Sequence, residues 1–194
     1  MGGLASPAVS GLPHILIVCT ANQCRSPMAE GLLRSLAGSL VDVASAGTAA
    51  YDGVPATQDA VTAMEERGID IGGHSSRRAT TDLIGGADLI LTMGRLHLQR
   101  VVVLSPDAFG RTFTLKELVR RTREFGPLRP DEALEAWLAR IHTGRRPKDL
   151  MGSSPDDDIA DPVGQGLVRY RRTADQLTDL LAALATDLGI APEA

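Results

Sequence analysis

The stretch HILIVCTANQCRSPMAEGLL, residues 14–33, decides the fold. Residues 14–18 form a short apolar run directly after Pro13, a pattern typical of a buried strand. The run gives way to the segment CTANQCRS, and Pro27 then begins a helical pattern, because its fixed φ suits the first helical turn. One face of that helix is apolar, with Met28, Leu32, Leu33 and Leu36. The stretch therefore predicts a strand, a tight loop and a helix N-terminus, an arrangement that binds anions in parallel α/β folds.

The rest of the chain continues this alternation. We expect further strands over 40–47, 87–93 and 101–104, helices over 56–67, 115–122, 131–141 and 166–188, and a loop-like segment over 143–160. Apolar strands that alternate with helices predict a parallel sheet covered on both faces. The expected fold is a single three-layer α/β domain with a four-stranded parallel sheet over residues 14–190, preceded by a flexible leader over 1–13.

The composition is that of an ordinary globular protein. Of its 194 residues, 43% are hydrophobic and 23% charged, which excludes wholesale disorder and a fibrous repeat. A net charge of −4 gives no electrostatic argument for a nucleic-acid partner. No stretch approaches the ~18 apolar residues of a membrane span, and the N-terminus lacks the basic and apolar regions of a signal peptide. We therefore expect a cytoplasmic protein with no nucleic-acid or membrane partner.

Cys19 and Arg25 give the predicted loop its chemistry. Cys19 is one of only two cysteines in the chain, which are too few for a disulfide scaffold or a cysteine-based zinc site. A thiolate needs a positive environment, which a helix N-terminus beside an arginine provides. Arg25 can bind two oxygens of a tetrahedral oxyanion while backbone N–H groups bind the others. Asn22 tolerates a positive φ, and the Ser26 hydroxyl can point back at the sulfur. The alternative is a small buried cysteine followed by an ordinary helix start.

The motif VCTANQCRSPMAEGLL closely resembles the signature of the low-molecular-weight protein tyrosine phosphatases. The resemblance continues in order through DVASAGTAAY, ERGIDIGGHSSRRAT, ADLILTM and ADPVG, over about residues 15–188 apart from the 105–158 region. It implies that Cys19 is the nucleophile, that Arg25 binds phosphate and that Asp161 is the general acid. It also implies a phosphate-binding loop of Thr20, Ala21, Asn22, Gln23, Cys24, Arg25 and Ser26, supported by a network of Asn22, Ser26, Ser45 and His74. No metal or cofactor is implied, because Arg25 and backbone donors supply the positive charge.

Each of these roles has a simpler alternative. Asp161 precedes Pro162, and Asp-Pro is a common turn element, with the carboxylates of 156–158 nearby as rivals. His74 could cap a turn or lie on the surface, and Ser45 could be a strand-end turn residue. Cys24 could form a reversible disulfide with Cys19 that shields the nucleophile from overoxidation, or it could be a packed loop thiol.

The sequence departs from the family pattern around the expected substrate cleft. Aromatic residues commonly follow the Asp-Pro in this family, where this chain has Val163 and Gly164. Val163 and Tyr51 are therefore the expected cleft walls, and stacking on an aryl phosphate would be weaker. In addition, Gly94 replaces an acidic residue that often follows the methionine at the end of the third strand.

A second departure is an enlarged segment over residues 105–158. The chain between Met93 and Asp161 is roughly thirty residues longer than is typical, more than a connecting loop requires. The enlargement contains Trp137 and an Arg-rich stretch over 120–148. It could form a lid or bind an acidic partner, or it could be a helix packed on the surface with solvated arginines.

The expected function is hydrolysis of a phosphomonoester through a phosphocysteine intermediate, with protein phosphotyrosine as the expected substrate. The substrate would be a phosphorylated protein or a small phosphomonoester. One alternative is an arsenate reductase that uses a small-thiol partner, since no cysteine follows Cys24 and a three-cysteine relay is excluded. The other is a non-catalytic phosphoprotein-binding module, which would usually have lost Cys19, Arg25 or Asp161.

Overall fold

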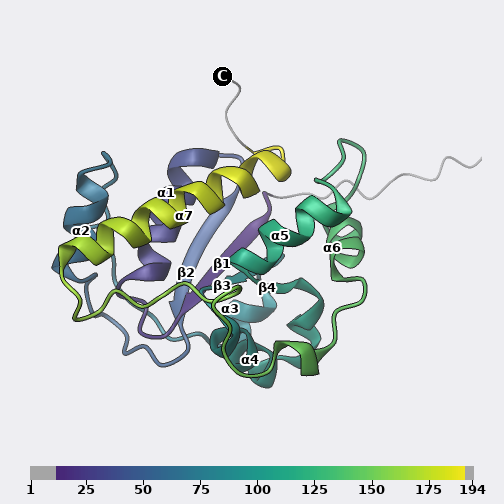
Figure 1. The fold of residues 1–194 in the computed structure, drawn as a ribbon, viewed down its shortest axis with the longest axis horizontal. Coiled ribbons are helices and arrows are strands. Elements are labelled where there is room, and N and C mark those ends of the chain that lie inside the picture. The colour runs from purple at the N-terminus through teal and green to yellow at the C-terminus, as the bar shows by residue number, and fades with distance from the viewer. Residues whose placement is uncertain (1–11, 191–194) are drawn as a thin grey trace, which may run out of the picture.

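Four parallel strands form the centre of the molecule in a computed structural model that describes residues 12–190 (Figure 1). Their order is β2 (Asp42–Gly47), β1 (His14–Cys19), β3 (Leu89–Thr92) and β4 (Thr112–Thr114). β1 pairs with β2 from His14 opposite Asp42 and with β3 from Ile15 opposite Leu89. The leader predicted over 1–13 falls mainly on residues 1–11, which lie outside the described residues.

Helices cover both faces of this sheet. Alternate residues of β1 point to opposite faces, so Ile15 and Ile17 pack in one apolar core and Leu16 and Val18 in another. The first core is closed by α1 (Arg25–Ala37), α2 (Gln58–Glu65), α5 (Leu115–Phe125), α6 (Leu134–His142) and α7 (Leu167–Asp187). The second is closed by α3 (Thr81–Gly85), α4 (Arg95–Leu104) and the 3-10 helix η1 (Pro106–Arg111), and a further 3-10 helix, η2, spans Pro147–Leu150. The predicted four-stranded α/β fold with helices on both faces is confirmed.

The prediction of the fourth strand was wrong in its position. Residues 101–104 are the last turn of α4, and the fourth strand is the three-residue segment Thr112–Thr114. The run of valines favoured a strand because β-branched residues are common there. In the structure Leu98 and Val101, three residues apart, are buried while Val103 is exposed, which is helical spacing.

The enlarged segment is packed into the protein rather than attached to its surface. Trp137 of α6 is fully buried in the first core, and its indole Nε1 donates to the Gly126 carbonyl at 3.2 Å. Farther along, the Arg145 guanidinium lies 4.0 Å from the centre of the Phe113 ring and pairs with Glu117 at 2.7 Å. Five basic side chains of 120–148 are bonded to acceptors within the chain, although those of Arg120 and Arg146 are also more than half exposed to solvent: Arg120, Arg121, Arg140, Arg145 and Arg146.

Arginines also contact the two edge strands of the sheet. On β2, the carbonyl of Val43 accepts from Arg34 at 2.7 Å and that of Ser45 accepts from Arg77 at 2.8 Å. On β4, the carbonyl of Thr112 accepts from Arg145 at 2.8 Å. Three backbone carbonyls on the edge strands are thus hydrogen-bonded by arginine side chains.

Candidate active site

The thiol of Cys19 lies at the carboxyl end of β1, where the loop 19–26 leads into α1. Its Sγ accepts from the backbone N–H of Asn22 at 3.2 Å and is 3.0 Å from the Ser26 hydroxyl oxygen. The Ser26 oxygen already accepts from the Asn22 side-chain amide at 2.9 Å, so its own hydrogen is free to point at the sulfur. Two donors, the backbone N–H of Asn22 and the hydroxyl of Ser26, are therefore directed at Sγ.

Asn22 supports the loop from within. It has the left-handed φ of 56° that its residue type tolerates, and it is completely buried. Its amide nitrogen donates to Ser26 and, at 2.8 Å, to Ser45, while its carbonyl oxygen Oδ1 accepts from the backbone N–H of Arg77. The ring Nε2 of His74 is 2.7 Å from the backbone carbonyl oxygen of Asn22. The structure thus brings together all four residues of the predicted supporting network.

Gly47, at the end of β2, allows the loop to approach the sheet closely. A Cβ at this position would lie 2.5 Å from the carbonyl oxygen of Thr20 and 2.9 Å from the backbone nitrogen of Asn22. The backbone N–H of Thr48 donates to the carbonyl of Cys19 at 2.9 Å. Glycine is required here because any side chain would collide with the loop backbone.

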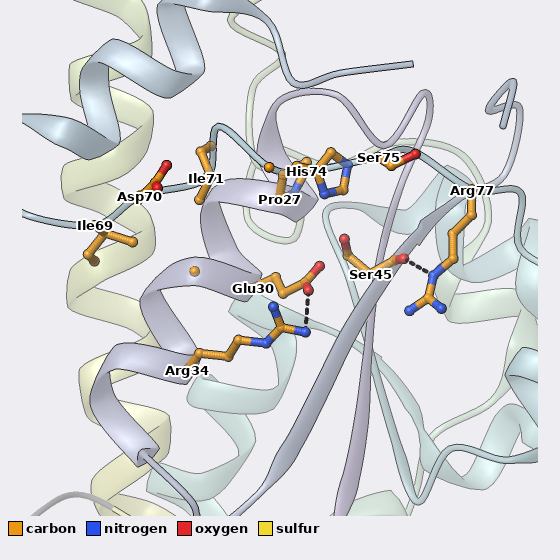
Figure 2. Close-up of a pocket in the computed structure, with 12 residues that line it drawn as sticks. Pro27, Glu30, Arg34, Ser45, Ile69, Asp70, Ile71, His74, Ser75 and Arg77 are labelled. Carbon is orange, nitrogen blue, oxygen red and sulfur yellow. Dashed lines mark hydrogen bonds and ion pairs between the residues drawn. The ribbon is translucent and has the colours of Figure 1, made fainter. Parts of the chain in front are cut away.

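A cavity of about 510 Å³ lies beside the supporting network, between α1, β2 and the segment 69–77. Ser45 and His74 form part of its wall, and Figure 2 shows the Glu30–Arg34 ion pair on the helix side. Cys19 and Asp161 are not among the residues that line it. The cavity therefore lies apart from the thiol and contacts the loop only through its supporting residues.

Arg25 is the first residue of α1, and its guanidinium points toward Ile159 and Asp161. Arg25 is buried, with an exposed fraction of 7%. Its Nη1 donates to the carbonyl of Ile159 at 3.1 Å, and its Nη2 donates to Oδ2 of Asp161 at 2.5 Å. Its Nε is buried and has no hydrogen-bond partner among the described residues. An oxyanion above the loop would supply an acceptor for this donor.

Four carboxylates lie close together in the sequence, at positions 156–158 and 161. Asp161 is the one that forms an ion pair with Arg25. Asp157 is fully buried between two arginines, and Asp158 accepts from the backbone N–H groups of Ser154 and Arg95. Asp161 is about half exposed, and its Oδ1 accepts from the backbone N–H of Val163 at 3.2 Å. A carboxyl group that is both accessible and beside the loop is suited to proton transfer.

His97 is a residue of this site that the sequence did not indicate. Its Nε2 is 2.8 Å from the Thr20 hydroxyl oxygen, which in turn lies 3.5 Å from Nη2 of Arg25. Burial, and next the positive charge of Arg25, lower the pKa of His97 to about 4, so the ring is neutral at physiological pH. No sequence signal marked it, because the helix α4 that carries it was not predicted.

The two expected cleft residues are exposed side chains. Tyr51, in the loop after β2, is 80% exposed, and Val163, two residues after Asp161, is 57% exposed. Within residues 12–190 no hydrogen bond or ring contact links either side chain to the loop 19–26. Both side chains are therefore accessible to a ligand, and the loop does not hold either of them in place.

Cys24 is a buried free thiol on the inner side of the loop, and Cys19 is also free. Its Sγ is 3.3 Å from the Thr57 hydroxyl and 3.5 Å from the Tyr170 hydroxyl. Burial raises the pKa of the Cys24 thiol, and burial also raises that of Tyr170 to about 12. In this conformation Cys24 is packed against α2 and α7, as a loop thiol would be.

No metal site is evident in the part of the chain that the structure describes, where no three His, Cys, Asp or Glu side chains cluster closely enough. Among residues 12–190, no helix combines the length and apolar character needed to cross a bilayer.

Comparison with known proteins identifies the family. The family model described as low molecular weight phosphotyrosine protein phosphatase matches residues 14–131. The chain belongs to this family. The prediction of the resemblance is thereby confirmed, and a low molecular weight phosphatase fold explains the cysteine loop at the end of β1.

Relatives of this low molecular weight phosphatase include proteins named as tyrosine phosphatases and proteins named as arginine phosphatases. The chain is 45% identical to a probable low molecular weight protein-tyrosine-phosphatase, EpsP, of Ralstonia solanacearum, over 67% of this chain and 89% of EpsP. It is 35% identical to the protein-arginine-phosphatase of Bacillus subtilis, over 90% of this chain and 95% of the relative. Among solved structures, the YwlE arginine phosphatase from Geobacillus stearothermophilus aligns with a TM-score of 0.67 at 34% identity, over 90% of this chain and 91% of that one.

Proposed function

We propose that the protein hydrolyses phosphomonoesters, with protein phosphotyrosine as the favoured substrate. The observation that carries the proposal is the convergence of Cys19, Arg25 and Asp161 at one loop. Donors are directed at Sγ, and the buried Nε of Arg25 has no hydrogen-bond partner within residues 12–190. A nucleophile, an anion-binding cation and an accessible carboxyl are the groups that this reaction requires.

In the first step the Cys19 thiolate attacks phosphorus, so that an S–P bond forms as the bond to the leaving oxygen breaks. Asp161 gives a proton to that oxygen, and the leaving group departs as a neutral alcohol or phenol. Arg25 and the backbone N–H groups of 20–26 hold the remaining oxygens as their charge changes. Asn22, Ser26, Ser45 and His74 keep the loop in the required conformation, as their hydrogen bonds indicate.

In the second step water attacks the phosphocysteine. The P–O bond to water forms as the S–P bond breaks, and Asp161 takes the proton that water loses. The products are inorganic phosphate and the regenerated Cys19 thiolate. Arg25 stabilises the negative charge of the phosphoryl oxygens in both steps, so neither step uses a metal ion.

Phosphoarginine is a second candidate substrate. The relatives named protein-arginine-phosphatase match this chain over 90% of its length, whereas the match to EpsP covers 67%. Val163 also offers a small apolar wall that gives an aryl ring no stacking partner. Tyr51 and Val163 would form the sides of the cleft for either substrate, and both are exposed.

The proposal is tested with purified protein in the presence of a chelator. Hydrolysis of p-nitrophenyl phosphate is expected for the wild type and should be lost in Cys19→Ser, with folding of the variant checked by circular dichroism. Unchanged turnover in Cys19→Ser would contradict the mechanism. Relative kcat/KM for phosphotyrosine and phosphoarginine peptides of the same sequence decides the substrate class. Arsenate-dependent oxidation of a small thiol would instead indicate the reductase, and phosphopeptide binding without turnover would indicate a binding module.

We further propose that residues 14–190 act as one phosphatase domain in a reducing cytoplasm, which would keep Cys19 and Cys24 in the free state. The acidic partner predicted for the Arg-rich stretch 120–148 remains a proposal. Arg123 and Arg129 are the exposed arginines there with no side-chain bond among the described residues, so they are the groups that such a partner would meet.

A further inference from the structure

Asp157 is a completely buried carboxylate four residues before Asp161. Its Oδ2 accepts from Nε of Arg95 at 2.6 Å, and its Oδ1 accepts from Nη2 of Arg120 at 2.8 Å. A charge without water must be paired, and both oxygens are satisfied by guanidinium groups. Because Arg95 begins α4 and Arg120 lies in α5, Asp157 connects the segment before Asp161 to two helices.

Asp158 fixes the same segment at a second point. Its Oδ1 accepts from the backbone N–H of Arg95 at 2.7 Å, and its Oδ2 accepts from that of Ser154 at 3.0 Å. The carboxylate occupies the space beside Gly94, where an added Cβ would lie 2.7 Å from Oδ1. Glycine at position 94 therefore leaves room for Asp158, and the N-terminus of α4 gains a carboxylate from a distant part of the chain.

The next residue continues the connection toward the thiol loop. The backbone N–H of Ile159 donates to the carbonyl of Met93 at 2.9 Å, and the carbonyl of Ile159 accepts from Nη1 of Arg25. Residues 157–159 are thus bonded to α5, to the start of α4, to the residue that follows β3 and to Arg25. Asp161 follows only two residues later, so its reach over the loop depends on this attachment.

We propose that Asp157 is a positioning residue that sets the location of the Asp161 carboxyl through its pairs with Arg95 and Arg120. This inference rests on the proposed function, in which Asp161 protonates the leaving group. Asp157 touches no reacting atom. Its effect is to hold the segment that carries the acid, while the loop 19–26 is held by its own network.

The test compares Asp157→Asn with Asp156→Asn, which removes an exposed carboxylate at the adjacent position. The readout is kcat/KM, because it reports only the steps up to transfer of the phosphoryl group to Cys19 and leaves out the later attack of water. For phenyl phosphate, a poor leaving group, kcat/KM should fall about tenfold or more in Asp157→Asn, because a misplaced acid loses much of its contribution. For 2,4-dinitrophenyl phosphate, which departs without a proton, it should change by about twofold or less. Asp156→Asn should match the wild type with both substrates. An equal fall with both substrates would overturn the proposal.

Hydrogen exchange provides a readout that needs no activity. Backbone amides of 157–163 should exchange faster in Asp157→Asn, and those of 19–26 should exchange at the wild-type rate. If the wild type shows no phosphatase activity, the proposed function fails while this measurement still decides whether Asp157 holds the segment. Unchanged exchange over 157–163 would refute that role.

A second variant covers the case in which Asp157→Asn does not fold. Arg120→Gln removes one partner of Asp157 from a half-exposed position on α5 and leaves the pair with Arg95. Arg123→Gln, on the same helix, is its matched control. Arg120→Gln should reproduce the selective loss with phenyl phosphate in smaller measure, and identical behaviour of the two arginine variants would overturn the proposal.

Discussion

Nη2 of Arg25 and Oδ2 of Asp161 lie 2.5 Å apart and join the cysteine loop to the segment around residue 161. The pair joins the group proposed to bind phosphate to the group proposed to donate the proton. A phosphate dianion that enters the loop must compete with the Asp161 carboxylate for the same guanidinium nitrogen. In the proposed mechanism, substrate binding would therefore exchange one anion for another at Arg25 and release Asp161 toward the leaving group.

This exchange predicts that removal of the carboxylate strengthens oxyanion binding. Asp161→Ala frees Nη2 of Arg25 and removes a negative charge beside the bound anion, so Kd for inorganic phosphate should fall about two- to fivefold, the size expected for a half-exposed ion pair. The measurement is isothermal titration calorimetry, with Asp156→Ala as the control for a lost exposed carboxylate. Unchanged or weaker binding by Asp161→Ala would show that the pair does not compete with the ligand.

The close approach at Gly47 predicts a specific loss of loop geometry. In Gly47→Ala the new methyl group would meet the backbone of Thr20 and Asn22, so the loop must shift. Overpacking of this kind costs about 1–3 kcal/mol, and we expect phosphate affinity and kcat/KM to fall about tenfold or more. Gly85→Ala is the control, since nothing lies within 4 Å of a Cβ there. Equal activity of the two variants would contradict the steric argument.

The buried pair of Arg145 and Glu117 predicts a large effect on stability. Arg145→Met leaves the Glu117 carboxylate buried without its partner, which should lower the free energy of unfolding by about 3–5 kcal/mol. Arg146→Met, at the next position, breaks only an exposed pair with Asp149 and should cost less than about 1 kcal/mol. Urea denaturation of the two variants measures the difference, and a similar midpoint for both would argue against a structural role for Arg145.

His97 predicts a loss of stability in mild acid. Its pKa is about 4 in the folded protein against an ordinary 6.5, so the unfolded state binds more protons between these values. The contribution is fully present above pH 6.5 and is lost as the pH falls through about 4, by up to about 3 kcal/mol at 1.36 kcal/mol per pH unit. His142, whose pKa burial also lowers, acts in the same direction. In urea denaturation from pH 4 to 7, His97→Gln should flatten the dependence of the unfolding free energy on pH. An unchanged slope in His97→Gln would remove His97 as its source.

The loop and most of the fold could be predicted because the residues that define them are neighbours in the sequence. The apolar run 14–18, the loop and the proline at the start of α1 are contiguous, so one stretch indicates strand, anion site and helix. Ser45 and His74 are distant in the sequence and were assigned from the resemblance alone. The structure places both against Asn22, one through its amide and the other through its backbone carbonyl.

The elements that were missed depend on contacts between distant segments. β4 has three residues, too few for an alternating pattern, and it pairs with β3 along its whole length. The valines of α4 have a preference for strands, which is overridden in a helix that packs Val101 into the second core. The partners of Asp157 come from α4 and α5, so no local pattern distinguished it from its exposed neighbour Asp156.

The guanidinium groups at both edges of the sheet bear on self-association. An edge strand with free backbone groups is a template for another chain, and a route to aggregation. Here Arg34 and Arg77 occupy two carbonyls of β2, and Arg145 occupies one of β4, so an incoming strand must first displace them. A guanidinium offers five donors in a plane, which an ammonium group lacks. Of the 20 lysine and arginine residues in the chain, only Lys116 and Lys148 are lysines. Replacement of these three arginines by lysine would preserve the net charge but leave the edge strands more available for pairing with another chain.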